Sequence, residues 1–183
     1  MNKTDILAYF SRLDKRLDTP SVLHIYGSAA VILLGADDRT SLDIDVAGPY
    51  STVNDAQFAE ASAAAGLPVN PAPDVASNHL EWVGALRLCL PPPPPEAESL
   101  VLWRGANLLV KTGKVEDLVA SKLIRYDETD QADIQFLAKT SRFTFESVAA
   151  SVKALPRPFD TDILVLENLA NLKADLAAWE GRT

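Results

Sequence analysis

Two aspartates two positions apart are the side chains of this sequence best suited to chemistry. Asp43 and Asp45 lie in Leu42–Val46, where apolar and acidic residues alternate. Such alternation predicts a β-strand, on which both carboxylates point to one side and Ile44 points into the core. A pair of carboxylates can hold one or two Mg²⁺ ions, which take carboxylate and phosphate oxygens. The pair therefore indicates a site for a metal and a phosphate-bearing substrate, although a solvated strand edge has the same pattern.

A glycine and a serine stand upstream of the aspartates, between a short apolar run and a short helix. Val22–Tyr26 has the composition of a buried strand, and Ala29–Leu34 is predicted to be a helix closed by Gly35. Gly27 allows the backbone to come close to a phosphate. Ser28 adds a hydroxyl at a helix N-terminus, where free N–H groups and the helix dipole favour anions.

Each of these features is common on its own as a purely structural element. In this order, and after an apolar strand, the glycine, the serine and the two aspartates together favour a nucleotide site. In such a site a metal would neutralise a nucleoside triphosphate and orient in-line attack on its α-phosphorus.

The elements that must hold these residues form a mixed α/β part, which we assign to residues 1–112. Its first helix is predicted over residues 5–17, with Thr4 as the cap. Its other predicted elements are a helix at Asn54–Ala65, a strand within His79–Leu90 that we place at Ala85–Leu90, and a hairpin of Leu100–Trp103 and Asn107–Lys111.

Helical periodicity replaces this mixed pattern from Val115 onward. The predicted helices are Val115–Tyr126, Asp130–Lys139, Thr144–Leu155 and Asp160–Glu180. Residues 113–183 thus form a C-terminal helical part. Because no flexible linker precedes it, we expect this part to pack on the α/β core as one unit.

Composition limits the kinds of function that fit. The 183 residues carry a net charge of −8, so a wide nucleic-acid-binding face is disfavoured, while a local basic groove remains compatible. A single cysteine and two histidines argue against an internal disulfide and against a Cys- or His-based zinc site. The N-terminus does not resemble a secretory signal, and no run approaches the roughly 18 apolar residues of a membrane span. We therefore expect a cytoplasmic protein.

The stretch Ile25–Val46, with Gly27-Ser28 and Asp43-Ile44-Asp45, resembles the first motif of the nucleotidyltransferase superfamily. It is most similar to the AbiEii-type toxin group and its small uncharacterised relatives. Those proteins have Gly-Gly or Gly-Ser, a short helix ending in Gly, an Arg-x-(Ser/Thr) loop and then Asp-Ile-Asp. In this sequence the loop arginine is Arg39.

A second stretch carries the same resemblance. Glu116–Arg125 followed by Asp130–Leu137 is similar to the segment E-D-L-x-x-x-K-L … D-x-x-D-I-x-x-L of that group. The resemblance therefore covers about residues 22 to 137. It implies a nucleotidyltransferase-like α/β (α+β) fold, in which helices flank a mixed sheet and a C-terminal helical part follows.

Site roles follow from the resemblance residue by residue. Asp43 and Asp45 would be the catalytic, metal-binding pair, and Gly27 and Ser28 would bind phosphates. Lys122 would contact the nucleotide phosphates, and Arg125, Asp130 and Asp133 would lie near the site. Lys122 and Arg125 are three residues apart on one predicted helix, so they share a face. Structural roles are open alternatives for the two later aspartates, since Asp130 resembles an N-cap and Asp133 falls in the first helical turn.

One departure from the family pattern concerns a third carboxylate. Active members of the superfamily generally carry one on a neighbouring strand, as metal ligand or general base. The strands predicted at Ala85–Leu90, Leu100–Trp103 and Asn107–Lys111 contain no acidic residue, and Glu81 is the nearest candidate.

The sequence therefore supports two functions. The first is transfer of a nucleoside monophosphate from an NTP, with Mg²⁺ or Mn²⁺, to a tRNA 3′ end or a protein hydroxyl, in a toxin–antitoxin or phage-defence system. The alternative is a catalytically degenerate fold that binds a nucleotide or a partner protein, as an antitoxin would. A cognate toxin or antitoxin protein is the expected partner, an oligomer is compatible with the helical part, and no membrane association is expected.

Overall fold

The structure is a computed structural model that describes residues 1–72 and 77–180. The chain divides into two compact units, of which the first comprises Met1–Leu88 with Pro95–Gly113 and the second Cys89–Pro94 with Lys114–Thr183. The junction at Gly113 lies one residue from the boundary expected from the sequence. The short segment Cys89–Pro94, in contrast, was expected in the first part and belongs to the second unit. That the two units pack as one stays a prediction.

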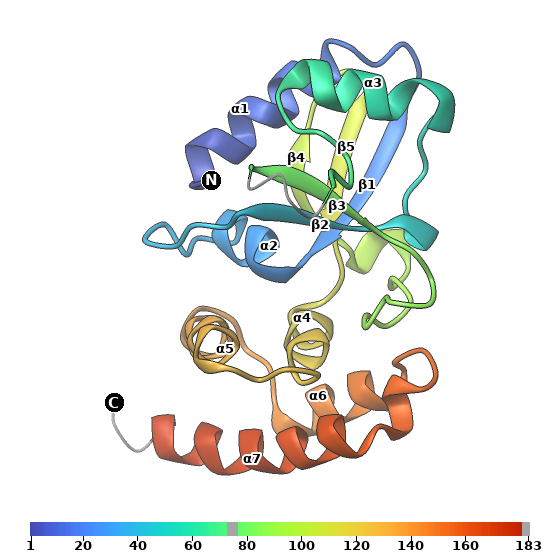
Figure 1. Cartoon of the computed structure of the whole chain (residues 1–183). Helices are drawn as coiled ribbons and strands as arrows, with labels where there is room; N and C mark the ends of the chain where they lie inside the picture. The colour runs from blue at the N-terminus through green and yellow to red at the C-terminus, as the bar shows by residue number, and fades with distance from the viewer. Residues whose placement is uncertain (73–76, 181–183) are drawn as a thin grey trace. The chain divides into compact units, whose positions relative to one another are not determined.

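The first unit is built on a five-stranded mixed sheet in the order β3-β2-β1-β5-β4 (Figure 1). β1 pairs antiparallel with β2 and parallel with β5, while β3 is parallel to β2 and β4 antiparallel to β5. The strands are β1 (Ser21–Tyr26), β2 (Asp43–Ala47), β3 (His79–Val83), β4 (Leu100–Arg104) and β5 (Leu108–Thr112). The mixed sheet and the β4–β5 hairpin confirm the predicted fold class.

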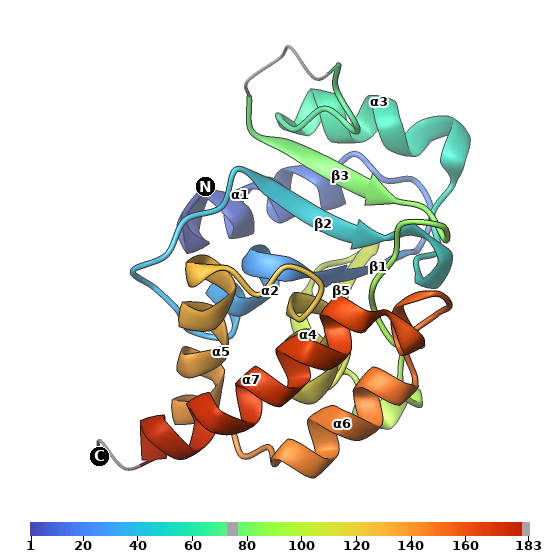
Figure 2. The same ribbon diagram turned by 60° about the horizontal axis from the view of Figure 1, so that its bottom comes forward.

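Helices cover both faces of this sheet. α1 (Lys3–Asp14) and α3 (Asp55–Ala65) lie over one face, and α2 (Gly27–Leu33) lies at the other (Figures 1 and 2). Short 3₁₀ turns are η1 (Gly48–Tyr50) and η2 (Glu96–Glu98). The ring of Phe58 in α3 lies 5.4 Å from that of Trp82, so α3 packs on the side of the sheet that carries Ile44, Val46 and Leu80, all fully buried.

Capping explains where two of these helices begin and end. α1 begins earlier than predicted because Asn2, not Thr4, is its N-cap, in a capping box with Asp5. α3 ends as predicted at Gly66, whose φ of 111° is the left-handed conformation that favours glycine.

The predicted strand at Ala85–Leu90 is wrong. The strand of this region is β3, and the chain turns directly after it, with Arg87 N–H donating to the carbonyl of Gly84 (3.0 Å). Leu86 is 95% exposed, so the alternation of residues 85–90 does not reflect a sheet face. Two adjoining segments both alternate, and only pairing with β2 selects the first.

The second unit contains four helices among its described residues (Figure 2). They are α4 (Val115–Lys122), α5 (Glu128–Thr140), α6 (Phe145–Lys153) and α7 (Ile163–Glu180), preceded in the last case by the 3₁₀ turn η3 (Phe159–Thr161). α4 ends at Lys122, before the predicted end at Tyr126, whose φ of 54° a right-handed helix cannot contain. The last helix begins at Ile163 rather than at Asp160. Across the described residues, no helix has the length and apolar character needed to cross a membrane.

Candidate functional site

The turn from β1 into α2 brings the backbone against a carboxylate. Gly27 is the first residue of α2 and has a φ of 66°, a left-handed conformation that costs an L-residue with a side chain. A Cβ at this position would also overlap with Oδ2 of Asp45. Both the conformation and the close approach therefore require glycine, and they place the start of α2 directly beside Asp45.

The two aspartates of β2 point to one side of the sheet. Asp43 and Asp45 are half-buried, whereas Ile44 between them is fully buried on the side covered by α3. Ser41 donates a hydrogen bond from Oγ to Oδ1 of Asp43 (3.1 Å). The alternation in the sequence thus gives the geometry expected from a β-strand.

A third carboxylate stands on the neighbouring strand. β3 runs parallel to β2 with Glu81 opposite Asp45 and His79 opposite Asp43. Paired residues of adjacent strands point to the same side of a sheet, so Glu81 shares the face of the two aspartates. The wrong strand prediction had left this residue unplaced. The sequence signal for this strand is the alternation His79-Leu80-Glu81, which the neighbouring residues 85–90 share. In the structure Leu80 is fully buried, on the opposite face from Glu81.

Two basic side chains that sequence reasoning missed hold Glu81. Its Oε1 lies 3.0 Å from Nη2 of Arg87, and its Oε2 lies 3.7 Å from Nε2 of His79. Nδ1 of His79 is in turn 3.0 Å from the carbonyl of Ser77. Within the described ranges, no group of three or more His, Cys, Asp or Glu side chains is arranged to hold a metal ion. The three carboxylates therefore share a face without converging on one point.

The remaining predicted residues of the first unit lie in α2 and in the loop before β2. Ser28 follows Gly27 in α2 and is half-buried. Arg39 is also half-buried, in the loop between α2 and β2, where its backbone N–H donates to the carbonyl of Ala36 (3.1 Å). Their contacts with a phosphate stay predictions.

The other predicted group, in the second unit, forms a buried ion cluster. Nζ of Lys122 donates to Asp130 (3.2 Å) and to Asp133 (2.7 Å), and all three side chains are at most 5% exposed. Arg125 binds Asp130 through two parallel hydrogen bonds of 2.9 and 3.0 Å. These contacts tie the end of α4 to the first turns of α5. The role of Lys122 and Arg125 toward a nucleotide stays a prediction.

The predicted N-cap of α5 is wrong. Asp127 is the cap, and its carboxylate accepts the backbone N–H of Asp130 (2.9 Å). Asp130 lies one turn further on and uses its own carboxylate for the two cations. The sequence contains an acidic residue at both positions, and the left-handed Tyr126 just before Asp127 decides which one caps the helix.

The mixed sheet, with Gly27 at the start of α2 and acidic residues on β2 and β3, is the arrangement expected of a nucleotidyltransferase-like protein. Comparison with protein families agrees with this class. A family described as a nucleotidyltransferase of unknown function (DUF6036) matches residues 4–157. Since the match covers most of the chain, the protein belongs to this family. Comparisons with curated proteins and with solved structures gave no match.

Proposed function

We propose that the protein transfers a nucleoside monophosphate from an NTP to an acceptor hydroxyl, at the face formed by Gly27, Asp43, Asp45 and Glu81. The observation that carries the proposal is the fit of the α2 N-terminus against Asp45, where a Cβ at Gly27 would overlap the carboxylate. Because Gly27 has no side chain, the Asp45 carboxylate lies directly beside the start of α2. A phosphate whose cation is held by the two aspartates would therefore lie next to the free N–H groups of this helix.

The residues present fit a divalent cation. Mg²⁺ is usually held by one or two carboxylates together with substrate phosphates, so it does not need a complete protein cage. Asp43 and Asp45 offer two carboxylates on one side of β2 and would hold Mg²⁺, or Mn²⁺ in its place. The bound cation would supply neutralisation of the triphosphate charge.

In the proposed reaction, Glu81, Gly27 and Ser28 have separate roles. The acceptor oxygen forms a bond to the α-phosphorus, the bond from that phosphorus to the bridging oxygen breaks, and pyrophosphate leaves. The proton of the acceptor hydroxyl goes to a carboxylate, for which Glu81 is the candidate because it is opposite Asp45 in the register of β3. Gly27 and Ser28 would orient the phosphates with the N–H groups at the start of α2.

The acceptor and the biological setting rest on the sequence resemblance. The similarity to the AbiEii-type group supports a tRNA 3′ end or a protein hydroxyl as acceptor, in a toxin–antitoxin or phage-defence system with a cognate toxin or antitoxin as partner. The net charge of −8 favours an acceptor held through few phosphate contacts.

A catalytically degenerate, nucleotide- or partner-binding module is the second candidate. It is favoured by the engagement of Glu81 with Arg87 and His79, and by the lack of a convergent metal-ligand group within the described residues. In this function the two aspartates would still bind a metal–nucleotide complex without completing transfer.

Thermal melting with each NTP, in the presence and absence of Mg²⁺, tests the site. A ligand at about 100 times its Kd stabilises the folded state by about 2.7 kcal/mol, which raises the Tm of a domain of this size by roughly 5 °C or more. We expect this Mg²⁺-dependent shift in the wild-type protein and its loss in the variant Asp43→Asn/Asp45→Asn. The matched control is Asp37→Asn/Asp38→Asn, which changes two exposed acids of the preceding loop and should retain the shift.

An equal shift in both variants would mean that nucleotides bind elsewhere. If no nucleotide raised the Tm of the wild-type protein, nucleotide transfer and nucleotide binding would both be contradicted. Binding of a partner protein would then be the remaining candidate function.

A further inference from the structure

The second unit has a cavity of its own. It measures about 680 Å³ and lies between α5, α7 and the segment that leads into α6. This volume is in the range of pockets that bind organic ligands of a few rings. The aromatic and charged side chains that line it are Lys139, Phe143, Phe145, Glu146, Lys173 and Trp179.

Three aromatic side chains supply flat apolar surface to this cavity. Phe143, Phe145 and Trp179 are each only half-buried, although aromatic rings of this size contribute most when they are fully covered. Nζ of Lys173 lies 5.2 Å from the centroid of the Phe145 ring, in a cation–π contact. The cavity therefore offers ring faces with an ammonium group next to them.

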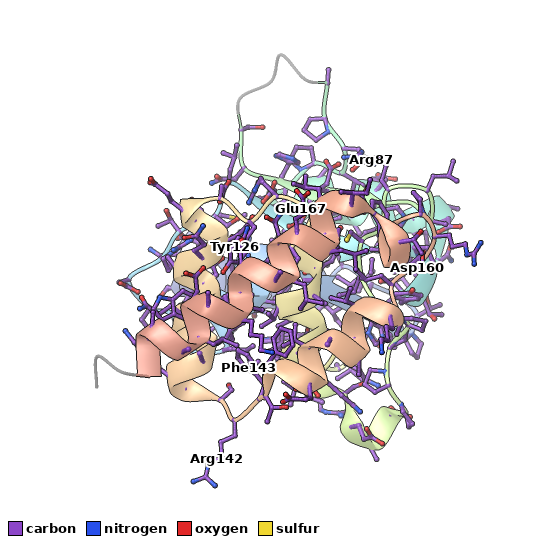
Figure 3. All side chains as sticks on the ribbon, turned by 90° about the horizontal axis from the view of Figure 1, so that it is seen from below. Arg87, Tyr126, Arg142, Phe143, Asp160 and Glu167 are labelled. Atoms are coloured by element: carbon purple, nitrogen blue, oxygen red, sulfur yellow. The ribbon has the colours of Figure 1, made fainter. Side chains whose placement is uncertain are left out.

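Lysines outnumber acidic residues in the lining of the cavity, whereas the whole chain is acidic. Two exposed lysines, Lys139 and Lys173, line it together with one glutamate, Glu146, whereas the chain as a whole has a net charge of −8. Arg142, in the same segment as Phe143, is exposed and points away from the helices (Figure 3). The charged side chains that line the cavity are thus two lysines and one glutamate.

We propose that this pocket binds an unpaired nucleotide of a single-stranded RNA. The base would stack on the aromatic rings, and Lys139 and Lys173 would neutralise the adjoining phosphates. Aromatic platforms combined with cations are the general means by which proteins hold unpaired bases. An acidic peptide would use the lysines but not the three rings, and an apolar ligand would use the rings but not the lysines. The proposal goes beyond nucleotide transfer at the sheet and does not assume it.

Fluorescence anisotropy of a labelled single-stranded RNA of 12 nucleotides, without self-complementarity, tests this proposal. We expect Lys139→Gln/Lys173→Gln to weaken binding about tenfold, and to reduce the slope of log K against log salt by roughly 1.4, since each phosphate contact with a single strand contributes about 0.7. Trp179→Ala should also weaken binding about tenfold through loss of stacking, while Trp179→Phe, which keeps a ring, should bind nearly as well as the wild-type protein.

The control for charge is Lys153→Gln/Arg157→Gln, which removes two exposed cations of the second unit that do not line the cavity. Affinity for RNA should stay at the wild-type level in this control. Any Mg²⁺-dependent Tm shift with NTP should persist in Lys139→Gln/Lys173→Gln, which separates a failure of this proposal from a failure of the nucleotide-transfer site.

Three results would overturn the proposal: no binding of the RNA at 50 mM salt, equal losses in the control and in Lys139→Gln/Lys173→Gln, or poly-glutamate competing as well as unlabelled RNA. If free AMP displaced the labelled RNA as well as an equal concentration of RNA nucleotides does, the pocket would bind free mononucleotides. That result would contradict single-stranded RNA as its ligand.

Discussion

At the scale of single residues, Gly27 is the position where sequence, backbone and site chemistry meet. Its φ of 66° and the carboxylate of Asp45 beside it are two separate reasons for the absence of a side chain. A glycine next to a serine is common, so the sequence alone left a plain turn open as an explanation. The close approach to Asp45 is what distinguishes this glycine from an ordinary turn.

The variant Gly27→Ala should lower the free energy of unfolding by roughly 2 kcal/mol, because the left-handed conformation alone costs about 1–2 kcal/mol and the Cβ displaces Asp45. Any Mg²⁺-dependent Tm shift with NTP should be lost as well. Urea denaturation and thermal melting measure the two effects. Gly84→Ala is the control, since a Cβ there meets nothing within 4 Å, and its stability should change by less than about 0.5 kcal/mol. Equal behaviour of the two variants would contradict the role given to Gly27.

The position of Glu81 could not be predicted from local sequence patterns. The pair Asp43 and Asp45 could be predicted with its orientation, because alternation within five residues fixes which side each faces. Glu81 could only be named as the nearest acid. Its place opposite Asp45 depends on pairing between strands separated by more than thirty residues in the chain, and the neighbouring alternation at residues 85–90 competed with it.

At the scale of elements, the pairing of α4 with α5 rests on buried charge. Lys122, Asp130 and Asp133 are almost fully covered, and removing one partner of such a group leaves an uncompensated charge in the interior. The sequence showed a lysine and two aspartates at helical spacing, a pattern compatible with phosphate binding and with an ion cluster alike. Only the distances between side chains of two helices separate these roles.

Replacing Lys122 with Met should therefore reduce the free energy of unfolding by about 3 kcal/mol or more, measured by urea denaturation. Lys153→Met, at an exposed position of α6, should have an effect below about 0.5 kcal/mol. Adding Asp133→Asn to Lys122→Met should recover part of the loss. If Lys122→Met kept full stability and lost only affinity for NTP, the lysine would serve the phosphates and not the helix pair.

The turn of the β4–β5 hairpin is held by the carboxylate of Asp14. Asp14, at the end of α1, accepts the backbone N–H groups of Ala106 (3.1 Å), Asn107 (2.7 Å) and Leu108 (2.8 Å). Partial burial raises the pKa of Asp14, but the hydrogen bonds from these three N–H groups outweigh it and hold the pKa below its ordinary value of 3.8.

Asp14→Asn should thus cost about 2 kcal/mol at pH 7, since hydrogen bonds to a charged acceptor are worth more than neutral ones. Because the folded-state pKa is depressed, the contribution of the carboxylate is complete above pH of about 4 and is lost as the pH falls through the folded-state value. Urea denaturation at pH 7 and pH 3 should show the gap between wild type and variant narrowing at the lower pH. A gap of the same size at both values would contradict the account.

At the scale of the whole molecule, the chain has two compact units, and the family match at residues 4–157 extends through both. Strand alternation and helical periodicity act over short windows, so local patterns predict a mixed α/β part followed by a helical part. That these two parts are the domains of the protein stays a prediction. Local patterns did not suffice for the end of α4, which was predicted at Tyr126, because no pattern indicates that this bulky residue adopts a left-handed conformation. Nor did they suffice for the assignment of Cys89–Pro94 to the second unit.

The central claim is nucleotidyl transfer at the face of Asp43, Asp45 and Glu81. The most direct measurement incubates the protein and Mg²⁺ with NTP carrying a label on either the α- or the γ-phosphate, and follows label bound to total RNA and to total protein. We predict transfer from the α-labelled NTP alone, its loss in Asp43→Asn/Asp45→Asn, and a strong reduction in Glu81→Gln. Transfer of the γ-label, or α-label transfer that persists in the double variant, would contradict the claim.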